Sequence, residues 1–151
     1  MVQRVEARAR SGASPQEVFD VLADVTCWSR WGRWSRAELE RPDEAGGGGV
    51  GAVRVLESRS YGRTVVNREL VTELVPGETL GYHLLSGLPL RDYHGRVELR
   101  PDGDGTLVTW SCRFERATPG LTRLYRRALQ GVLSDAVERL ARYAERDHAT
   151  A

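Results

Sequence analysis

Tyrosine and histidine side chains gather around one short loop and are the first candidates for chemistry. Tyr82 and His83 precede the loop at residues 86–89, and Tyr93 follows it. Both residue types join an apolar body to a polar tip, which suits the orientation of an aromatic ligand and acid–base work. Tyr82 alternates in phase with Leu80 and His83 does not, so we expect His83 on the convex, solvated face. For Tyr82, contact with a ligand and ordinary half-burial in a sheet are equally compatible with the pattern.

Charged and amide side chains interrupt two of the segments that have strand character. They are Arg54, Asn67, Arg68 and Glu69. Each points to solvent or to the interior according to a register that the sequence does not determine. A buried one would require a partner or a ligand. Arg68 and Glu69 are neighbours along a strand and therefore point to opposite faces.

Metal and nucleophile signatures are weak. The chain has three histidines, His83, His94 and His148, without His-x-x-x-His or Cys-x-x-Cys spacing, and His94 has the pattern of a surface residue. Cys27 would be a nucleophile only beside a histidine base, and a buried structural thiol is commoner. Gly-x-Ser-x-Gly and Gly-x-Gly-x-x-Gly motifs are absent from the sequence. We therefore expect no metal site and no cofactor.

Length and composition limit the classes of function. The 151 residues fit a single ligand-binding domain over residues 1–151, with residues 147–151 expected to fray. A formal net charge of +1 argues against nucleic acid as a partner. The absence of long apolar runs argues against stable membrane association. Two cysteines and a polar first segment predict a cytoplasmic location. A homodimer stays an open alternative.

Alternating apolar and polar residues, separated by turn residues, predict an antiparallel meander. We expect strands at residues 2–11, 36–41, 50–57, 63–75, 80–85, 91–100 and 106–116. Ser14, Pro15 and Glu17 form a capping box that begins a short helix over residues 15–23. A second short helix begins near Asp24.

A long amphipathic helix is predicted over residues 118–148, with Thr118 as its N-cap and Pro119 in its first turn. Its apolar stripe consists of Leu121, Leu124, Tyr125, Ala128, Leu129, Val132, Ala136 and Leu140. Gly131 lies at the edge of this stripe. Because a glycine within a helix is unfavourable by ~1 kcal/mol relative to alanine, we expect Gly131 to lie over a pocket or against the sheet.

One helix does not fill the apolar face of a curved sheet, which predicts a groove between helix and sheet for an apolar ligand. Trp28, Trp31 and Trp34 are spaced three apart and would share one side of a helical turn. They would cap or gate one end of the groove, or pack as ordinary core residues.

Several stretches resemble one known superfamily. Residues 14–24 read SPQEVFDVLAD and precede two tryptophans, residues 73–82 read ELVPGETLGY, and residues 105–110 read GTLVTW. Together with the last helix they resemble the START-like (SRPBCC, helix-grip) superfamily, which includes the birch-pollen-allergen fold and the polyketide cyclase/dehydrase proteins. The resemblance implies an α+β fold: a curved antiparallel sheet of six to seven strands around a long C-terminal helix, with two short helices after the first strand.

The resemblance also implies a cavity between the last helix and the sheet. We expect it to bind a small hydrophobic or aromatic molecule of lipid- or polyketide-like chemistry. The alternative is an aromatase-type polyketide cyclase/dehydrase, in which Arg68 and Tyr82 would be catalytic. The expected ligand-binding residues are Trp28, Trp31, Tyr82, Tyr93, Trp110, Phe114, Tyr125, Leu129 and Val132.

Overall fold

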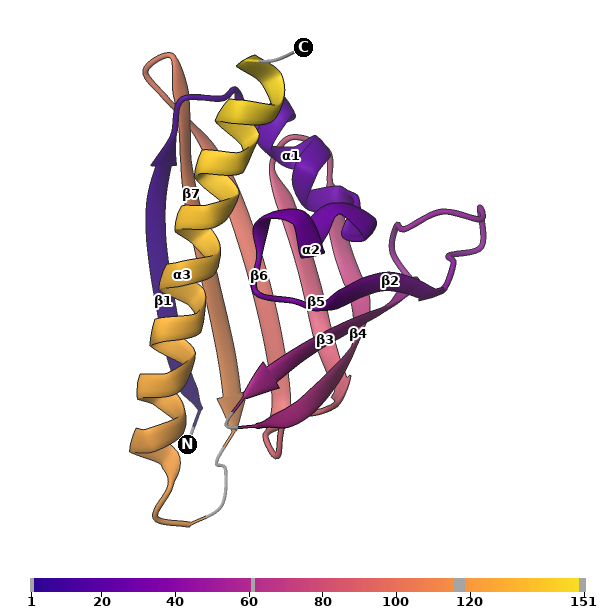
Figure 1. Ribbon diagram of the computed structural model, residues 1–151, viewed down its shortest axis with the longest axis vertical. Coiled ribbons are helices and arrows are strands. Elements are labelled where there is room, and N and C mark those ends of the chain that lie inside the picture. Colours follow the sequence, from indigo (N-terminus) through magenta and orange to yellow (C-terminus); the bar gives the residue numbers. More distant parts are fainter. Residues whose placement is uncertain (1, 61, 116–118, 150–151) are drawn as a thin grey trace.

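The computed structural model describes residues 2–60, 62–115 and 119–149, which form an antiparallel sheet covered on one face by helices (Figure 1). Within these residues the sheet has seven strands in the order β1-β7-β6-β5-β4-β3-β2. The strands are β1 (Gln3–Ser11), β2 (Arg36–Arg41), β3 (Val53–Ser60), β4 (Arg63–Val75), β5 (Thr79–Ser86), β6 (Arg91–Asp102) and β7 (Gly105–Glu115). The helical segments are α1 (Pro15–Ala23), the 3-10 turn η1 (Val25–Cys27), α2 (Trp28–Trp31) and α3 (Thr122–Ala149). The predicted α+β helix-grip architecture is confirmed.

The N-cap predicted for α1 is present at Ser14. The Ser14 hydroxyl accepts a hydrogen bond from the backbone N–H of Glu17 at 3.2 Å, and proline occupies the first turn. The cap satisfies one of the N–H groups that a helix leaves without an intrahelical partner. It starts a helix that buries Val18 and Leu22 completely against the sheet.

The helix α3 begins later than the sequence predicts. Its first residue is Thr122, and Gly120 has a positive φ of 86°, a conformation that interrupts helical geometry. The predicted N-cap, Thr118, lies outside the described residues. Pro119 belongs to a turn rather than to the first helical turn.

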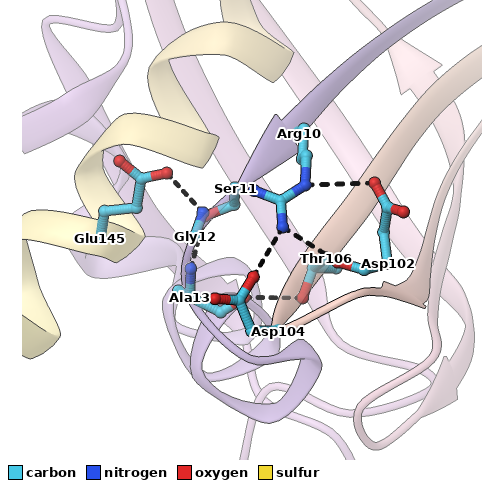
Figure 2. A network of polar contacts seen from close by, with 8 residues as sticks. All are labelled: Arg10, Ser11, Gly12, Ala13, Asp102, Asp104, Thr106 and Glu145. Atoms are coloured by element: carbon cyan, nitrogen blue, oxygen red, sulfur yellow. Dashed lines mark hydrogen bonds and ion pairs between the residues drawn. The ribbon is translucent and has the colours of Figure 1, made fainter.

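The C-terminal half of α3 is tied to the turn between β1 and α1 (Figure 2). The Glu145 carboxylate accepts a hydrogen bond from the backbone N–H of Gly12. The Ser11 hydroxyl donates to the carbonyl of Ala141 at 2.8 Å. The helix continues through Ala149, so residues 147–149, which were expected to fray, are helical.

The buried side of α3 differs from the predicted stripe. Leu129, Ala136 and Leu140 are buried as expected, but Leu124 and Val132 are 63% and 58% exposed. Leu121 and Ala128 are exposed as well. The buried residues of α3 are Leu129, Leu133, Ala136, Val137, Leu140, Ala141 and Ala144. Most of them lie in the C-terminal half of the helix, so the apolar residues of its first turns have no core to cover.

Polar residues occupy the side of the early α3 turns that faces β1. The Gln130 amide donates to the carbonyl of Glu6 at 2.9 Å, and the Arg126 guanidinium donates to the carbonyl of Arg4 at 3.5 Å. A Cβ atom on Gly131 would meet no atom within 4 Å. The prediction that Gly131 lies over a pocket or against the sheet is therefore wrong.

The core lies between the helices and the side of the sheet that carries Tyr82, Val97 and Trp110, which we call the inner face. These three side chains are at most 4% exposed. The α1 and α2 helices cover the middle of the inner face, and α3 runs along β1 (Figure 1). In the described part of the chain, no helix combines the length and the apolar character that crossing a membrane requires.

Candidate functional site

A buried ion pair lies on the inner face. Strand pairing places Arg54 of β3 opposite Glu69 of β4, and Glu69 opposite Leu84 of β5. Leu84 and Tyr82 are two positions apart on β5 and therefore lie on the same side of the sheet. Arg54 Nη2 lies 3.0 Å from Glu69 Oε1, and the two side chains are 2% and 8% exposed. A charged pair at this depth is expensive to desolvate and requires close partners.

Aromatic rings enclose the guanidinium of Arg54. Its Cζ lies 4.3 Å from the Trp28 ring centroid and 5.7 Å from the Tyr82 ring centroid, which is cation–π geometry. The Trp110 indole N–H donates to the Tyr82 hydroxyl at 3.0 Å. The Glu69–Arg54 ion pair therefore contacts the face of the Tyr82 ring, and the Tyr82 hydroxyl in turn is hydrogen-bonded to Trp110. We call these four residues together with Trp28 the inner cluster.

Three tryptophans on and after α2 cap the inner cluster. The centroid of Trp28 lies 5.3 Å from that of Trp31 and 5.0 Å from that of Trp34. Gly32 permits this arrangement, because a Cβ atom there would lie 2.1 Å from the Trp34 ring. The Trp28 indole N–H donates to the carbonyl of Leu22 at 3.0 Å, which fixes its ring. The predicted grouping of the three tryptophans is confirmed.

Burial shifts the ionisation of the inner-face groups. It raises the pKa of Glu69, and the charge and hydrogen bond of Arg54 oppose that rise. Burial, and next the charge of Glu69, raises the pKa of Tyr82; burial likewise places the pKa of Tyr93 well above its ordinary value. Both phenols therefore stay protonated at physiological pH, where they can donate a hydrogen bond but cannot act as bases.

Two buried polar atoms of β3 and β4 find no hydrogen-bond partner among the described residues. They are Arg54 Nε and Asn67 Oδ1. Asn67 pairs opposite Leu56, two positions from Arg54 along β3, so both side chains lie on the inner face. The Trp31 indole nitrogen has no conventional partner but lies beside the Cys27 thiol, whose pKa is raised chiefly by burial. The described residues therefore supply no acceptor for Arg54 Nε and no donor for Asn67 Oδ1.

Most of the predicted ligand-binding residues lie together in the interior. Those that are buried in the core are Trp28, Trp31, Tyr82, Tyr93, Trp110, Phe114 and Leu129. The ring centroids of Tyr82 and Tyr93 are 6.5 Å apart, as are those of Tyr93 and Phe114. Val132 is exposed, which contradicts its predicted place in the pocket. Tyr125 is half-buried on the part of α3 that extends past the core.

Arg68 does not face the interior. Its guanidinium forms two short hydrogen bonds with Glu40, at 2.9 Å and 2.7 Å, and its side chain is 43% exposed. Strand alternation puts Glu69 on the inner face and therefore Arg68 on the opposite one. The prediction that placed Arg68 in the cavity chose the wrong arginine. Arg54 and Glu69, which the sequence left undecided, hold the interior position.

The predicted groove is filled at the inner cluster. Between α3 and the sheet, a shallow depression of about 490 Å³ lies at the β1 edge, where Val5 meets Arg123, Arg126, Arg127 and Gln130. Another depression, of about 380 Å³, opens on the face of the sheet opposite the helices, at Gly81, Arg96 and Arg113. A ligand that reaches the aromatic interior must therefore displace side chains or part of α3.

Two of the three histidines meet on the outer face, the side of the sheet opposite the inner face. The rings of His83 and His94 stack with centroids 4.4 Å apart, and Asp92 lies beside them. Burial, followed by the charges of His83 and Arg113, lowers the pKa of His94. The convex position predicted for His83 is correct. The two histidines lack metal-ligand spacing along the chain, but strand pairing brings them together.

Comparison with solved structures agrees with this architecture. A START superfamily protein from Mycobacterium smegmatis aligns with a TM-score of 0.81 at 16% identity over 95% of this chain and 97% of that one. The ginseng major latex-like protein 151 from Panax ginseng aligns with a TM-score of 0.79 at 11% identity, covering 95% and 98%. The di-domain ARO/CYC StfQ from the steffimycin biosynthetic pathway aligns with a TM-score of 0.81 at 14% identity, covering 99% of this chain and 52% of that one. At these identities the likeness shows the fold alone.

Comparison with sequence families extends over nearly the whole chain. No curated protein sequence matches it. A family model described as polyketide cyclase / dehydrase and lipid transport matches residues 2–145, which include every strand, the capping tryptophans and most of α3. The chain therefore belongs to the polyketide cyclase / dehydrase and lipid transport family.

Proposed function

We propose that the protein binds a small hydrophobic or aromatic molecule, of lipid- or polyketide-like chemistry, whose polar group meets Arg54 on the inner face. The observation that carries this proposal is a fully buried arginine, enclosed by aromatic rings, whose Nε–H lacks a partner among the described residues. A buried donor left unsatisfied is unfavourable by about 1–3 kcal/mol. A ligand that supplies an acceptor would recover that free energy.

The neighbouring charges restrict the polar group of the ligand. Glu69 already neutralises Arg54 at 3.0 Å, so a second carboxylate would meet repulsion from Glu69. A carbonyl or hydroxyl oxygen satisfies the Arg54 N–H without adding a buried charge. The Trp28 and Tyr82 rings, which flank the guanidinium, favour a flat or apolar body next to that oxygen. Aromatic ketones and phenols fit this description better than fatty acids do.

Ligand entry requires movement of the first half of α3. Two of its apolar residues, Leu124 and Val132, are exposed, which leaves Leu129 and Leu133 as its buried ones. Its described hydrogen bonds to β1 are those of Gln130 and Arg126, both at exposed positions. The second half is held by the buried Ser11–Ala141 bond. Segments with few buried contacts open at the lowest free energy, so the first half of α3 is the expected gate.

Tryptophan fluorescence provides the binding assay, because all four tryptophans lie in the interior or at its rim. A panel of aromatic ketones, phenols and fatty acids is titrated into the wild-type protein and an Arg54→Met/Glu69→Leu double variant. The double variant removes both charges and is expected to fold. Arg68→Met, which removes a surface arginine from a neighbouring strand, is the matched control.

The expected result is saturable quenching by ketones or phenols that is lost in the double variant and kept in Arg68→Met. Equal binding by all three proteins would place the ligand elsewhere. No saturable binding by any compound, together with no co-purifying molecule in native mass spectrometry, would refute the carrier proposal.

A cyclase/dehydrase activity is the second candidate, favoured by the buried Tyr82–Tyr93 pair beside Glu69. Burial raises the pKa of both phenols, which keeps them protonated and suits hydrogen-bond donation to a carbonyl oxygen rather than proton abstraction. The test is turnover of a short poly-β-ketone thioester followed by product analysis. Glu69→Gln should abolish turnover and keep ligand quenching if the protein is an enzyme. Cyclisation no faster than in buffer would refute the enzymatic activity and leave ligand binding as the only proposed function.

A further inference from the structure

We propose that His83, Asp92 and His94 form a binding site for a divalent transition-metal ion on the outer face of the sheet. Each residue offers one ligand atom, and these atoms all lie within 4.8 Å of one another. The site lies on the other side of the sheet from the inner cluster and does not depend on the proposed function.

The two imidazoles are brought together by strand pairing. His83 of β5 is the direct partner of His94 of β6. Directly opposed residues have Cβ atoms roughly 4.5–5.5 Å apart, which is within reach of a shared ion for two imidazoles. The rings stack at an interplanar angle of 28°. Rotation about the Cβ–Cγ bond, a broad torsion in histidine, turns their nitrogens toward a common point.

Asp92 is positioned by a break in the regular ladder. The pairing of β6 with β7 shifts register between Arg91 and His94. Asp92 has a φ of 47°, in the left-handed region that residues other than glycine seldom adopt and that aspartate tolerates best. Asp92 lies two positions before His94, and this backbone geometry brings its carboxylate to the two imidazoles.

The donor set selects the class of metal. Two imidazoles and one carboxylate match Zn²⁺ and its neighbours Co²⁺, Ni²⁺ and Cu²⁺, whereas Mg²⁺ and Ca²⁺ prefer oxygen ligands. In tetrahedral zinc sites, ligand atoms are about 3.3 Å apart, given metal–nitrogen distances of about 2.0–2.1 Å. Ligand atoms within 4.8 Å of one another can therefore close on zinc by side-chain rotation.

The surroundings of the site favour an anion as an additional ligand. Three protein ligands leave one tetrahedral position open. His94, Arg96 and Arg113 line the depression of about 380 Å³ on this face. Arg113 is the β7 partner of His94, so its positive charge opposes a bare cation. A chloride, hydroxide or carboxylate in the fourth position would relieve that repulsion, and we expect apparent affinity to rise when such an anion is supplied.

The test uses the full chain without a histidine tag, treated with chelator and then titrated with ZnCl₂ or CoCl₂ in a calorimeter. The expected result is one bound ion per chain. His83→Ala and His94→Gln should each weaken binding by at least the roughly 10- to 100-fold that loss of an outer-shell partner causes. Asp92→Asn should weaken it less. His148→Ala, which replaces the remaining histidine of the chain, is the matched control and should bind as the wild type does.

Circular dichroism of the metal-free variants verifies that each has folded. Three outcomes would overturn the proposal. The first is the absence of stoichiometric binding by the wild type. The second is binding that survives both His83→Ala and His94→Gln. The third is a thiolate-to-cobalt charge-transfer band, which would place the ion on Cys27 or Cys112.

Discussion

Removal of Arg54 should have a larger effect on stability than removal of any surface arginine. Arg54→Met leaves Glu69, which is 6% exposed, without its counter-charge at 3.0 Å. Breaking a buried pair in this way lowers the free energy of unfolding by about 3–5 kcal/mol. The Arg54→Met/Glu69→Leu double variant removes both desolvated charges and should be near wild-type stability or above it, by up to about 4 kcal/mol.

Urea denaturation followed by tryptophan fluorescence measures these changes. With a slope of about 1–3 kcal/mol per molar urea, the single variant should lose on the order of 2 M in its midpoint while the double variant recovers it. Arg68→Met is the control: it breaks a pair with Glu40 whose partners are 43% and 38% exposed, so solvent screens the loss. If the single and double variants lose equal stability, packing against Trp28 rather than the uncompensated charge is responsible, and the argument fails.

The same variant gives a pH test with a defined sign. Burial raises the pKa of Glu69, and Arg54 opposes that rise. In Arg54→Met the pKa of Glu69 in the folded state rises further. At pH values above the ordinary carboxyl pKa, the folded state then binds more protons than the unfolded state. Stability then falls as pH rises through this window and recovers as pH falls. The deficit of Arg54→Met relative to wild type should be smaller at about pH 5 than at about pH 8. A deficit independent of pH would contradict a charged Glu69.

Three further substitutions should change the stability of the protein, one raising it and two lowering it, as measured by thermal and urea unfolding. Gly131→Ala should stabilise the protein by about 0.5–1 kcal/mol, because its Cβ enters open space in a helix; a loss would mean that this turn has an unrecognised contact. Gly95→Ala should destabilise it by about 1–3 kcal/mol, since its Cβ would lie 2.0 Å from the Tyr82 ring. Tyr82→Phe should lower stability by about 1–3 kcal/mol by leaving the Trp110 N–H without its acceptor; no change would indicate that water replaces the hydroxyl.

Local signals were sufficient to predict the strands and helices, and the family resemblance supplied their helix-grip arrangement. Alternation located all seven strands to within a few residues, and the capping box located the start of α1 at Pro15. These features depend on neighbours along the chain, which a sequence displays directly. The first turns of α3 depend instead on where the core ends. Leu124 and Val132 satisfy a helical period, but no core lies beneath them, so periodicity alone assigned them to the wrong environment.

The candidate site depended on register, which alternation does not determine. Arg54 and Arg68 both lie within predicted strands, and a slip of one position exchanges the inner and outer faces. The pairing of β4 with β5 also shifts between Arg68 and Glu69. Only the partner strands decide that Glu69 faces the aromatic rings and Arg68 faces Glu40. Arg54, Asn67, Arg68 and Glu69 were recognised as candidates, but the sequence did not determine that only Arg68 among them faces outward.

The β5–β6 pair shows why the spacing of histidines along the chain does not reveal which of them lie together in space. Each strand carries the dipeptide Tyr-His, at residues 82–83 and 93–94. Antiparallel pairing places both tyrosines on the inner face and both histidines on the outer face. The two chemistries are therefore separated by the thickness of one sheet and can be tested independently. His83→Ala should abolish metal binding and leave ligand quenching of the tryptophans unchanged, whereas the Arg54→Met/Glu69→Leu variant should do the reverse. Loss of both activities in either variant would show that the strands had moved, and would remove the support for two separate sites.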